Sequence, residues 1–281
     1  MDPDAYRADS RARWEQAAEG WETRRPAFQR AAEPVSMAMI DLLEPQPGHT
    51  VLELAAGPGD TGLLAAELVQ PGGKVLITDG AEAMVEAARR RAEELGIANV
   101  EVRPMEAEWI DLDAASVDGV LCRWGYMLLA DPEAALRETR RVLVSGGRVV
   151  LSAWAGQEHN PWLTALNEEG QARGLTKLPQ PGEPGPFAFA DPATIERLLG
   201  DTGFGEIRVE PVDFGFSYPS LDAYFDHQLD LSTRLKDQVR ALSPAEHTAF
   251  RDGLDARLAQ HVRPDGLLDL PARTWVAAAT A

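Results

Sequence analysis

The stretch VLELAAGPGDTG, residues 51–62, restricts the fold of this 281-residue chain more than any other feature. The apolar run at 49–54 predicts a short strand, and the pattern at 62–69 predicts a helix. GPGDTG between them fits G-x-G-x-x-G, in which glycines let the backbone turn tightly and approach a ligand closely. The sequence therefore predicts a ligand-binding loop at the carboxyl edge of an α/β sheet.

Strands and helices alternate on either side of this loop. We expect strands at 49–54, 74–78, 100–103, 118–124, 148–154, 206–213 and 273–279. Helices are expected at 62–69, 81–95, 133–143, 161–170 and 192–199. This alternation is typical of a parallel sheet with helices on both faces. We predict an α/β fold, namely a Rossmann-like, doubly wound, mostly parallel seven-stranded sheet with a helical cap.

Two helical blocks flank the predicted sheet. Residues 4–31 predict one helix and 35–43 a second one that begins after Pro34, while 220–262 reads as mostly helix. These blocks divide the chain into four parts. They are an N-terminal helical cap (1–45), a Rossmann-like cofactor-binding core (46–216), a helical cap insertion (217–265) and a final strand of the core sheet (266–281).

Charge and composition exclude several classes of function. The formal net charge is −18, so the chain would repel a nucleic-acid backbone. The N-terminus is charged and no apolar run approaches the length of a membrane span, so we expect no membrane association. Cys122 is the only cysteine, which favours a reducing, cytoplasmic location. The five histidines have no metal-ligand spacing, and no metal site is expected.

Glu53 helps to decide which cofactor the glycine loop holds. It stands at the end of the first strand, four residues before Gly57. A carboxylate has no use beside a dinucleotide pyrophosphate, whereas it suits the ammonium and sulfonium groups of S-adenosylmethionine. An NAD(P)-dependent oxidoreductase remains an alternative, supported by GPGDTG and Asp79. A second alternative is a non-catalytic protein that binds S-adenosylmethionine or its demethylated product.

Four segments carry a family resemblance: VLELAAGPGDTG, LITDGAEAMVEAARRRAEELGIANV, MEAEWIDLDAASVDGVLC and RETRRVLVSGGRVVLSAW. In order and spacing they resemble class I S-adenosylmethionine-dependent methyltransferases, over about residues 14 to 215. The small-molecule branch that includes the ubiquinone and menaquinone C-methyltransferases is the most similar. The resemblance implies methyl transfer from S-adenosyl-L-methionine to a small-molecule acceptor by direct displacement. The acceptor, the methylated atom and the oligomeric state remain open.

The resemblance also implies cofactor-binding residues. The methionine half would lie on Glu53, Ala55, Gly57 and Gly59, with Thr61 near the carboxylate. Asp79 would accept hydrogen bonds from the ribose, and Arg123 would close the site near the methyl group. The adenine would meet Gly80, Met84, Glu106 and the Ala107 N–H, and Trp21 of the N-terminal helix is a further candidate. Ala55 replaces a usual glycine, which requires a negative φ, and Glu106 is one methylene longer than the usual aspartate.

Aromatic residues and histidines supply the candidates for acceptor binding and catalysis. Trp124 and Tyr126 follow the fourth strand and Trp154 ends the fifth, so we expect all three to face the acceptor. His159 and His227 lie in the cap regions and are the candidates for a general base. Specificity is expected in the loops at 124–130, 155–190 and 217–265.

Overall fold

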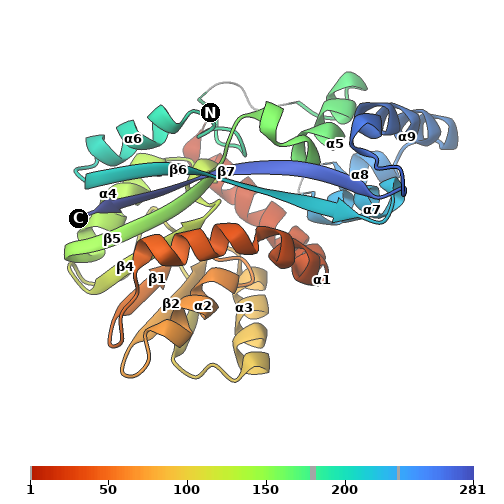
Figure 1. Cartoon of the computed structure of the whole chain (residues 1–281). Coiled ribbons are helices and arrows are strands. Elements are labelled where there is room, and N and C mark those ends of the chain that lie inside the picture. Colours follow the sequence, from red (N-terminus) through yellow and green to blue (C-terminus); the bar gives the residue numbers. More distant parts are fainter. Residues whose placement is uncertain (1, 178–181, 233–234) are drawn as a thin grey trace.

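A seven-stranded sheet forms the centre of the computed structural model, which describes residues 2–177, 182–232 and 235–281 (Figure 1). The strands are β1 (Thr50–Glu53), β2 (Lys74–Asp79), β3 (Val100–Pro104), β4 (Val117–Arg123), β5 (Leu143–Trp154), β6 (Gly205–Tyr218) and β7 (Leu268–Thr280). Their order is β3-β2-β1-β4-β5-β7-β6. Pairing is parallel from β3 to β5, and β7 is antiparallel to both neighbours. The predicted mostly parallel, doubly wound sheet is confirmed.

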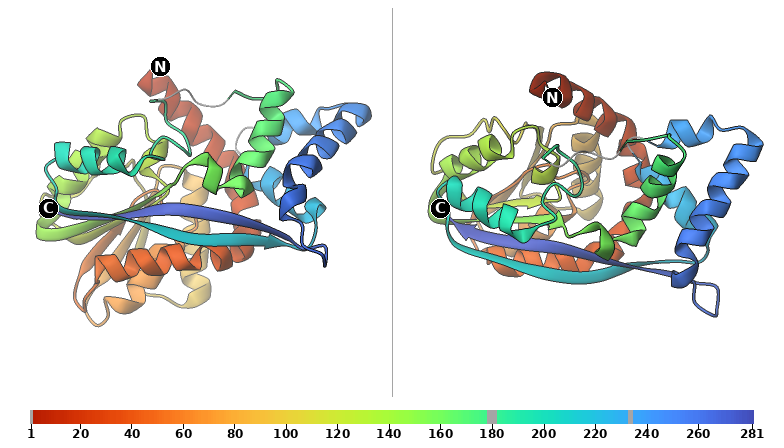
Figure 2. Two further views of the ribbon diagram at one scale, coloured as in Figure 1. Left: turned by 45° about the horizontal axis from the view of Figure 1, so that its top comes forward. Right: turned by 90° about the horizontal axis from the view of Figure 1, so that it is seen from above.

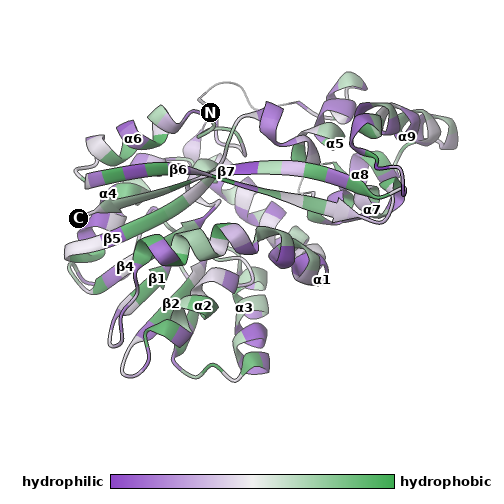
Figure 3. Cartoon of the chain, viewed as in Figure 1, coloured by the Kyte–Doolittle hydropathy of each residue, from purple (hydrophilic) through white to green (hydrophobic). Residues whose placement is uncertain are grey.

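The direction of winding reverses between β1 and β4, which are neighbours in the sheet. Leu52 of β1 pairs with Leu76 of β2 on one side and with Val120 of β4 on the other, and all three are buried. The middle of each of these strands is apolar because helices cover both faces of the sheet (Figure 3). In such folds a crevice opens at the carboxyl ends of the strands where the order reverses.

Helices cover the sheet on both sides. The helices α2 (Asp60–Leu68) and α3 (Glu82–Leu95) lie on one side, and α4 (Pro132–Val142) and α6 (Pro192–Asp201) lie on the other (Figure 1). Two of these helices have capped ends. Asp131 Oδ1 accepts a hydrogen bond from the Ala134 N–H at 2.9 Å, and Gly96 ends α3 with a φ of 67°.

The N-terminal region forms one helix, α1 (Pro3–Leu43), so the prediction of two helices separated at Pro34 was wrong. A proline inside a helix removes one backbone hydrogen bond and crowds the preceding turn. Packing outweighs that cost, because Phe28, Val35 and Met39 are buried in the core on either side of Pro34. The helix crosses the whole molecule, with its C-terminal half against the sheet and its N-terminal half over the carboxyl edge (Figure 2).

Strands β6 and β7 are longer than predicted, and their far ends form an arm beyond the other strands (Figure 2). The paired residues continue from Asp213 with Arg273 to Tyr218 with Leu268. The helices α7 (Leu221–Leu231), α8 (Lys236–Arg240) and α9 (Pro244–Leu258) connect the two strands. They pack with α5 (Pro161–Ala172) at the end of this arm. Within the described ranges, no helix has the length and apolarity needed to cross a membrane.

Candidate cofactor and acceptor site

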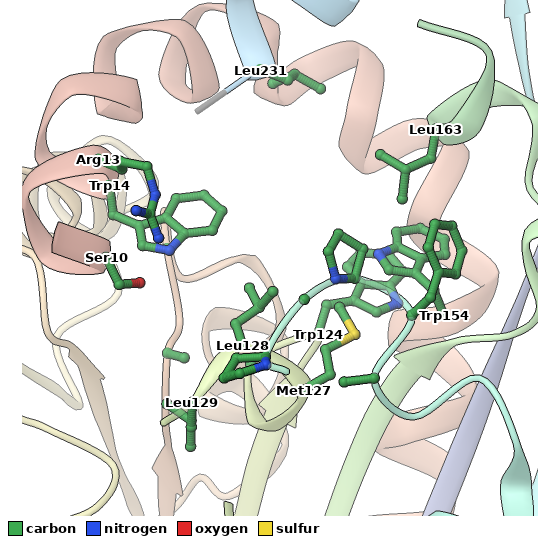
Figure 4. A pocket seen from close by; sticks show the side chains of 18 of the residues that line it. Ser10, Arg13, Trp14, Trp124, Met127, Leu128, Leu129, Trp154, Leu163 and Leu231 are labelled. Carbon is green, nitrogen blue, oxygen red and sulfur yellow. The ribbon is translucent and has the colours of Figure 1, made fainter. Parts of the chain in front are cut away.

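A cavity of about 710 Å³ lies at the carboxyl ends of the central strands, beneath the N-terminal half of α1 (Figure 4). This volume falls within the range of small-molecule binding sites. The predicted site residues that line it are Trp21, Ala55, Gly57, Asp79, Gly80, Met84, Glu106, Ala107, Arg123, Trp124 and Trp154. The structure thus brings most of the predicted site residues together, from elements between Trp21 and Trp154.

The glycine loop turns sharply at Ala55 and Gly57, which have φ values of 49° and 55°. The requirement of a negative φ at Ala55 was wrong, because the loop folds back so that the Ala56 N–H donates to the Thr78 carbonyl at 2.9 Å. Gly125 is a site residue that the sequence analysis missed. A Cβ there would lie 2.7 Å from the Ala55 Cβ, so only glycine lets the ends of β1 and β4 approach this closely.

Asp79, at the end of β2, holds the glycine loop and faces the cavity. Its Oδ2 accepts a hydrogen bond from the Gly57 N–H, and its Oδ1 accepts one from the Ala81 N–H, both at 2.9 Å. Burial raises the pKa of Asp79 to about 6, although these two hydrogen bonds oppose the shift. Each oxygen keeps a further lone pair for a ligand hydroxyl.

Glu53, Gly59 and Thr61 do not line the cavity, and their contact with the cofactor stays a prediction. The Glu53 carboxyl lies beneath the loop, where Oε2 accepts a hydrogen bond from the Gly62 N–H at 2.9 Å. Burial raises its pKa to about 8, opposed by nearby Arg123. Gly59 caps α2 with a φ of 80°, and Thr61 is fully buried in the first turn of α2. These residues therefore support the glycine loop on its side away from the cavity.

Arg123 lines the cavity and ties α1 to the sheet. Its Nη1 donates to Ser36 Oγ at 2.7 Å and to Gln29 Oε1 at 3.0 Å, both on α1. Its Nη2 lies 3.8 Å from Asp60 Oδ2, and Asp60 also pairs with Arg25 of α1 at 3.2 Å. Because this network is buried, it fixes the position of α1 over the cavity. It also fixes the position of the Arg123 guanidinium at the cavity wall.

Gly80 gives space to Glu106, which is one methylene longer than the aspartate usual in the family. A Cβ on Gly80 would lie 3.1 Å from Glu106 Oε2, so the small residue leaves room for the longer carboxylate. Glu106 is also paired with Arg11 of α1, and Glu108 is paired with Arg7 of the same helix. The N-terminal turns of α1 therefore close the cavity through ion pairs that the sequence alone did not suggest.

An aromatic wall forms the other half of the cavity. Trp124 and Trp154 stack with their ring centroids 4.3 Å apart and their planes at 8° (Figure 4). Trp162 of α5 lies 5.0 Å from Trp154, and Phe28 of α1 lies 5.5 Å from Trp124. Trp124 has a φ of 58° and donates from Nε1 to Thr274 Oγ1 at 2.9 Å, which fixes its ring. Phe28 and Trp162 are wall residues that the sequence analysis missed.

Tyr126, His159 and His227, the other predicted acceptor-side residues, do not line the cavity. Tyr126 is buried, with its hydroxyl 2.5 Å from Thr139 Oγ1 in the core. His159 is exposed and lies beside Glu158 on the short helix η2 (Gln157–His159). His227 is buried with Nδ1 2.7 Å from the Tyr218 hydroxyl, and burial lowers its pKa to about 4. The roles of Tyr126 in acceptor binding and of the two histidines as general bases stay predictions.

Metal chemistry has no obvious location in the described part of the chain, where no three His, Cys, Asp or Glu side chains cluster as metal ligands would. Cys122 is buried inside β4, and burial raises its pKa to about 12. A thiol that does not ionise at neutral pH is a poor nucleophile.

Comparison with known proteins places this site in a family. The family model for a methyltransferase domain matches residues 51–147. The demethylmenaquinone methyltransferase of Thermus thermophilus is 32% identical over 63% of this chain and 83% of its own length. The nocamycin O-methyltransferase of Saccharothrix syringae is 29% identical over 68% of this chain and 71% of its own length. An uncharacterized transposon protein of Streptomyces fradiae is 42% identical, but the match spans only 34% of that protein and 43% of this chain.

A solved structure supports the same assignment at the level of the fold. The YcgJ protein of Bacillus subtilis superposes with a TM-score of 0.60 at 19% identity, over 87% of this chain and 97% of its own. The chain belongs to the class I S-adenosylmethionine-dependent methyltransferases. The family and its relatives give no support to the oxidoreductase alternative or to a non-catalytic binding protein.

Proposed function

We propose that this methyltransferase acts on a small organic molecule that binds against the aromatic wall, with the methyl donor bound at Asp79 and the glycine loop. The main support is the shape of the cavity, which is lined continuously from Asp79 to Trp124 and Trp154. One space thus borders both the predicted donor site and a large apolar surface. Relatives named as methyltransferases of demethylmenaquinone and nocamycin fit such an acceptor.

The residues of the donor half fit S-adenosylmethionine. Asp79 has free lone pairs for the two ribose hydroxyls, and charged acceptors make strong hydrogen bonds. Met84 lies with Trp14 and Trp21 in an apolar cluster beside Asp79, where an adenine could pack. The Trp21 Nε1 is buried without a hydrogen-bond partner.

When bound, the cofactor supplies an electrophilic methyl group on a sulfonium. An electron pair of the acceptor forms the new bond to the methyl carbon, the carbon–sulfur bond breaks, and its pair remains on sulfur. The protein's task is to align the two molecules, for which effective molarity can contribute about 7–11 kcal/mol. Phe28, Trp124 and Trp154 would orient the acceptor, and α1 would exclude water from the contact.

We also propose the setting in which this reaction takes place. The buried, lone Cys122 fits a reducing cytoplasm, and the net charge of −18 fits an acceptor other than a nucleic acid. The division into caps and core at 1–45, 46–216, 217–265 and 266–281 stays a prediction.

Isothermal titration with S-adenosylhomocysteine, with NADH in parallel, tests the donor site. We expect micromolar binding of the first and none of the second. Incubation of the donor with a panel of phenols, enols and amines, followed by mass spectrometry, then tests transfer. Tight donor binding with no methylated product from any compound that binds the cavity would favour a binding protein and contradict the proposed reaction.

A further inference from the structure

The long helix α1 is attached to the rest of the molecule in two different ways, which meet near Pro26. After Pro26 the helix belongs to the main core, in which Phe28 and Met39 are buried. Before Pro26, Ala18 packs with Met84 in a small apolar cluster that is separate from the main core. Pro26 has no N–H, so the helix lacks one backbone hydrogen bond at this junction. The part before the junction can therefore move at a smaller loss of apolar contact than the part after it.

Next to this junction, α7 anchors the helix. A Cβ on Gly20 would lie 2.1 Å from the Asp230 carbonyl oxygen, so the two helices touch there. Arg24 Nη2 pairs with Asp230 Oδ2 at 2.7 Å. Residues 3–19 extend beyond this anchor over the carboxyl edge of the sheet, and we call them the α1 flap (Figure 2). The flap forms one wall of the cavity.

Glu15 connects the flap to the start of α3. Its Oε1 accepts a hydrogen bond from the Glu82 N–H at 2.5 Å, and its Oε2 accepts one from the Ala83 N–H at 2.9 Å. The first N–H groups of a helix have no partner within the helix, and the side chain of the N-cap residue Ala81 cannot accept a hydrogen bond. A residue of α1 therefore supplies the cap of α3.

The start of α3 belongs to the donor half of the cavity. Asp79 Oδ1 accepts a hydrogen bond from the Ala81 N–H, so carboxylates at both ends hold the turn at 79–83. Glu15 itself does not line the cavity. Burial is the main cause of the raised pKa of Asp79, and the negative charges of Glu106 and Glu15 add to the shift. The flap thus acts on the donor half at the turn that carries Asp79.

We propose that Glu15 is a positioning residue for the methyl donor: it closes the flap by capping α3 and holds the turn after Asp79 in its binding geometry. This role rests on the proposed donor site. Lifting the flap breaks both Glu15 hydrogen bonds and opens the cavity, so ligand release and loss of the α3 cap occur together. The ion pairs of Arg7 and Arg11 hold the flap to residues 106–108, whereas Glu15 acts on the turn that carries Asp79.

The release rate of S-adenosylhomocysteine tests this role. Stopped-flow tryptophan fluorescence measures the rate, because Trp14 and Trp21 line the cavity. Glu15→Ala should release the ligand about 3- to 10-fold faster and bind it more weakly by a similar factor, as expected for the loss of a helix cap. Glu19→Ala is the matched control. It removes the same charge one turn later in α1, where Glu19 is exposed and has no hydrogen bond or ion pair with another described residue, and it should not change the rate.

The pH dependence of binding separates positioning from a general loss of stability. Because the charge of Glu15 contributes to the raised pKa of Asp79, Glu15→Gln should shift the pH midpoint of S-adenosylhomocysteine binding to a lower value. Glu19→Gln should leave the midpoint in place. Isothermal titration at several pH values around 6 measures both midpoints. A purely structural effect of Glu15 would lower the melting temperature without moving the midpoint.

Hydrogen exchange of the unmodified protein provides a test that needs no variant. The amides of the flap, residues 3–19, should exchange faster than those of residues 28–43 in the same helix, because the flap opens without unfolding the core. Saturation with S-adenosylhomocysteine should slow exchange in the flap and at residues 82–83.

The possible results are distinguishable. Faster release from Glu15→Ala together with a lower midpoint in Glu15→Gln supports the positioning role. Release at the unmodified rate from a folded Glu15→Ala variant overturns it and leaves the proposed function intact. If that variant does not fold, hydrogen exchange decides, and equal exchange in both parts of α1 with and without ligand overturns the role. If S-adenosylhomocysteine does not bind the unmodified protein, the proposed function falls first and the role of Glu15 falls with it.

Discussion

The donor half and the acceptor half of the cavity are built in opposite ways. In the donor half, Gly57 lies in the loop after β1, Asp79 ends the adjacent strand β2, and the Gly57 N–H donates to the Asp79 carboxylate at 2.9 Å. In the acceptor half, Phe28, Trp154 and Trp162 come from α1, β5 and α5 and meet through ring faces and edges. The first half is local and polar, whereas the second is assembled from distant, apolar parts.

This difference predicts how cofactor binding and acceptor binding respond to substitutions in each half. The donor half depends on backbone geometry and a few carboxyl groups, so a single substitution should affect cofactor binding strongly. The acceptor half depends on summed ring contacts, each of which contributes about 0.5–1.5 kcal/mol beyond burial. Each single substitution there should change the affinity for the acceptor by a small amount and leave the affinity for the cofactor unchanged.

The largest expected effect is the pH dependence that buried Glu53 confers on stability. Its folded pKa of about 8 lies above the ordinary value of 4.5, so the folded protein holds a proton that the unfolded chain has lost. Stability should therefore fall as pH rises from about 4.5 to about 8, by on the order of 3 kcal/mol. Glu53→Gln should flatten this fall, as measured by urea unfolding at several pH values. An unchanged slope, equal to that of the exposed control Glu67→Gln, would contradict the assignment.

Asp79→Ala should weaken the binding of S-adenosylhomocysteine by about 1.5–3 kcal/mol, because hydrogen bonds to a charged group are lost. Isothermal titration measures this loss. In the unmodified protein, affinity should also fall below pH 6, by at most about tenfold per unit, because the bound form requires the ionised carboxyl. Asp79→Asn should bind with little pH dependence between 5 and 7. Unchanged affinity in the alanine variant would exclude Asp79 from the donor site.

Trp154→Phe should weaken binding in the acceptor half without affecting binding in the donor half. The smaller ring weakens stacking on Trp124, so the affinity for naphthalene, an aromatic probe measured by equilibrium dialysis, should fall by about 1 kcal/mol. The affinity for S-adenosylhomocysteine should not change. Trp109→Phe, at an exposed position, serves as the control in the same dialysis. If Trp154→Phe weakened cofactor and acceptor equally, the two halves would be one coupled site.

Ala55→Gly gives the smallest expected effect and tests the strain in the donor loop. Ala55 has a φ of 49°, which glycine adopts at no steric cost. The variant should be more stable by roughly 0.5 kcal/mol, because relief of strain exceeds the added entropy of the unfolded chain. Ala56→Gly, without a positive φ, should be destabilised by a similar amount. Denaturant unfolding of the two variants measures the difference, and equal losses of stability would show that Ala55 is unstrained.

The sequence predicted the donor half more accurately than the acceptor half. Asp79 and Gly57 line the cavity, and they were predicted as site residues because a strand, a glycine loop and a second strand follow one another along the chain. Glu53 was placed at the correct strand end, yet its side chain lies behind the loop, where it binds the Gly62 N–H. Periodicity assigns a residue to an element, but it does not decide which side of a turn a terminal side chain faces.

The acceptor half was predicted only in part, because long-range packing decides it. Trp124 and Trp154 were identified from their strand ends, whereas Tyr126, two residues after Trp124, turns into the core against Thr139. Phe28 and Trp162 lie on helices whose positions depend on the unbroken α1 and on the β6–β7 arm. No local pattern indicates either residue.

The sequence by itself determined the succession of strands along the chain, the glycine loop and the carboxylate at the end of the second strand. Together these features indicated the class of cofactor. These features depend on short-range periodicity and on turn residues, which act over a few positions. The tertiary structure decided the continuity of α1, the left-handed backbone at Ala55 and the composition of the aromatic wall. Those features depend on contacts between segments far apart in the chain, because only packing energy can outweigh an internal proline or a strained residue.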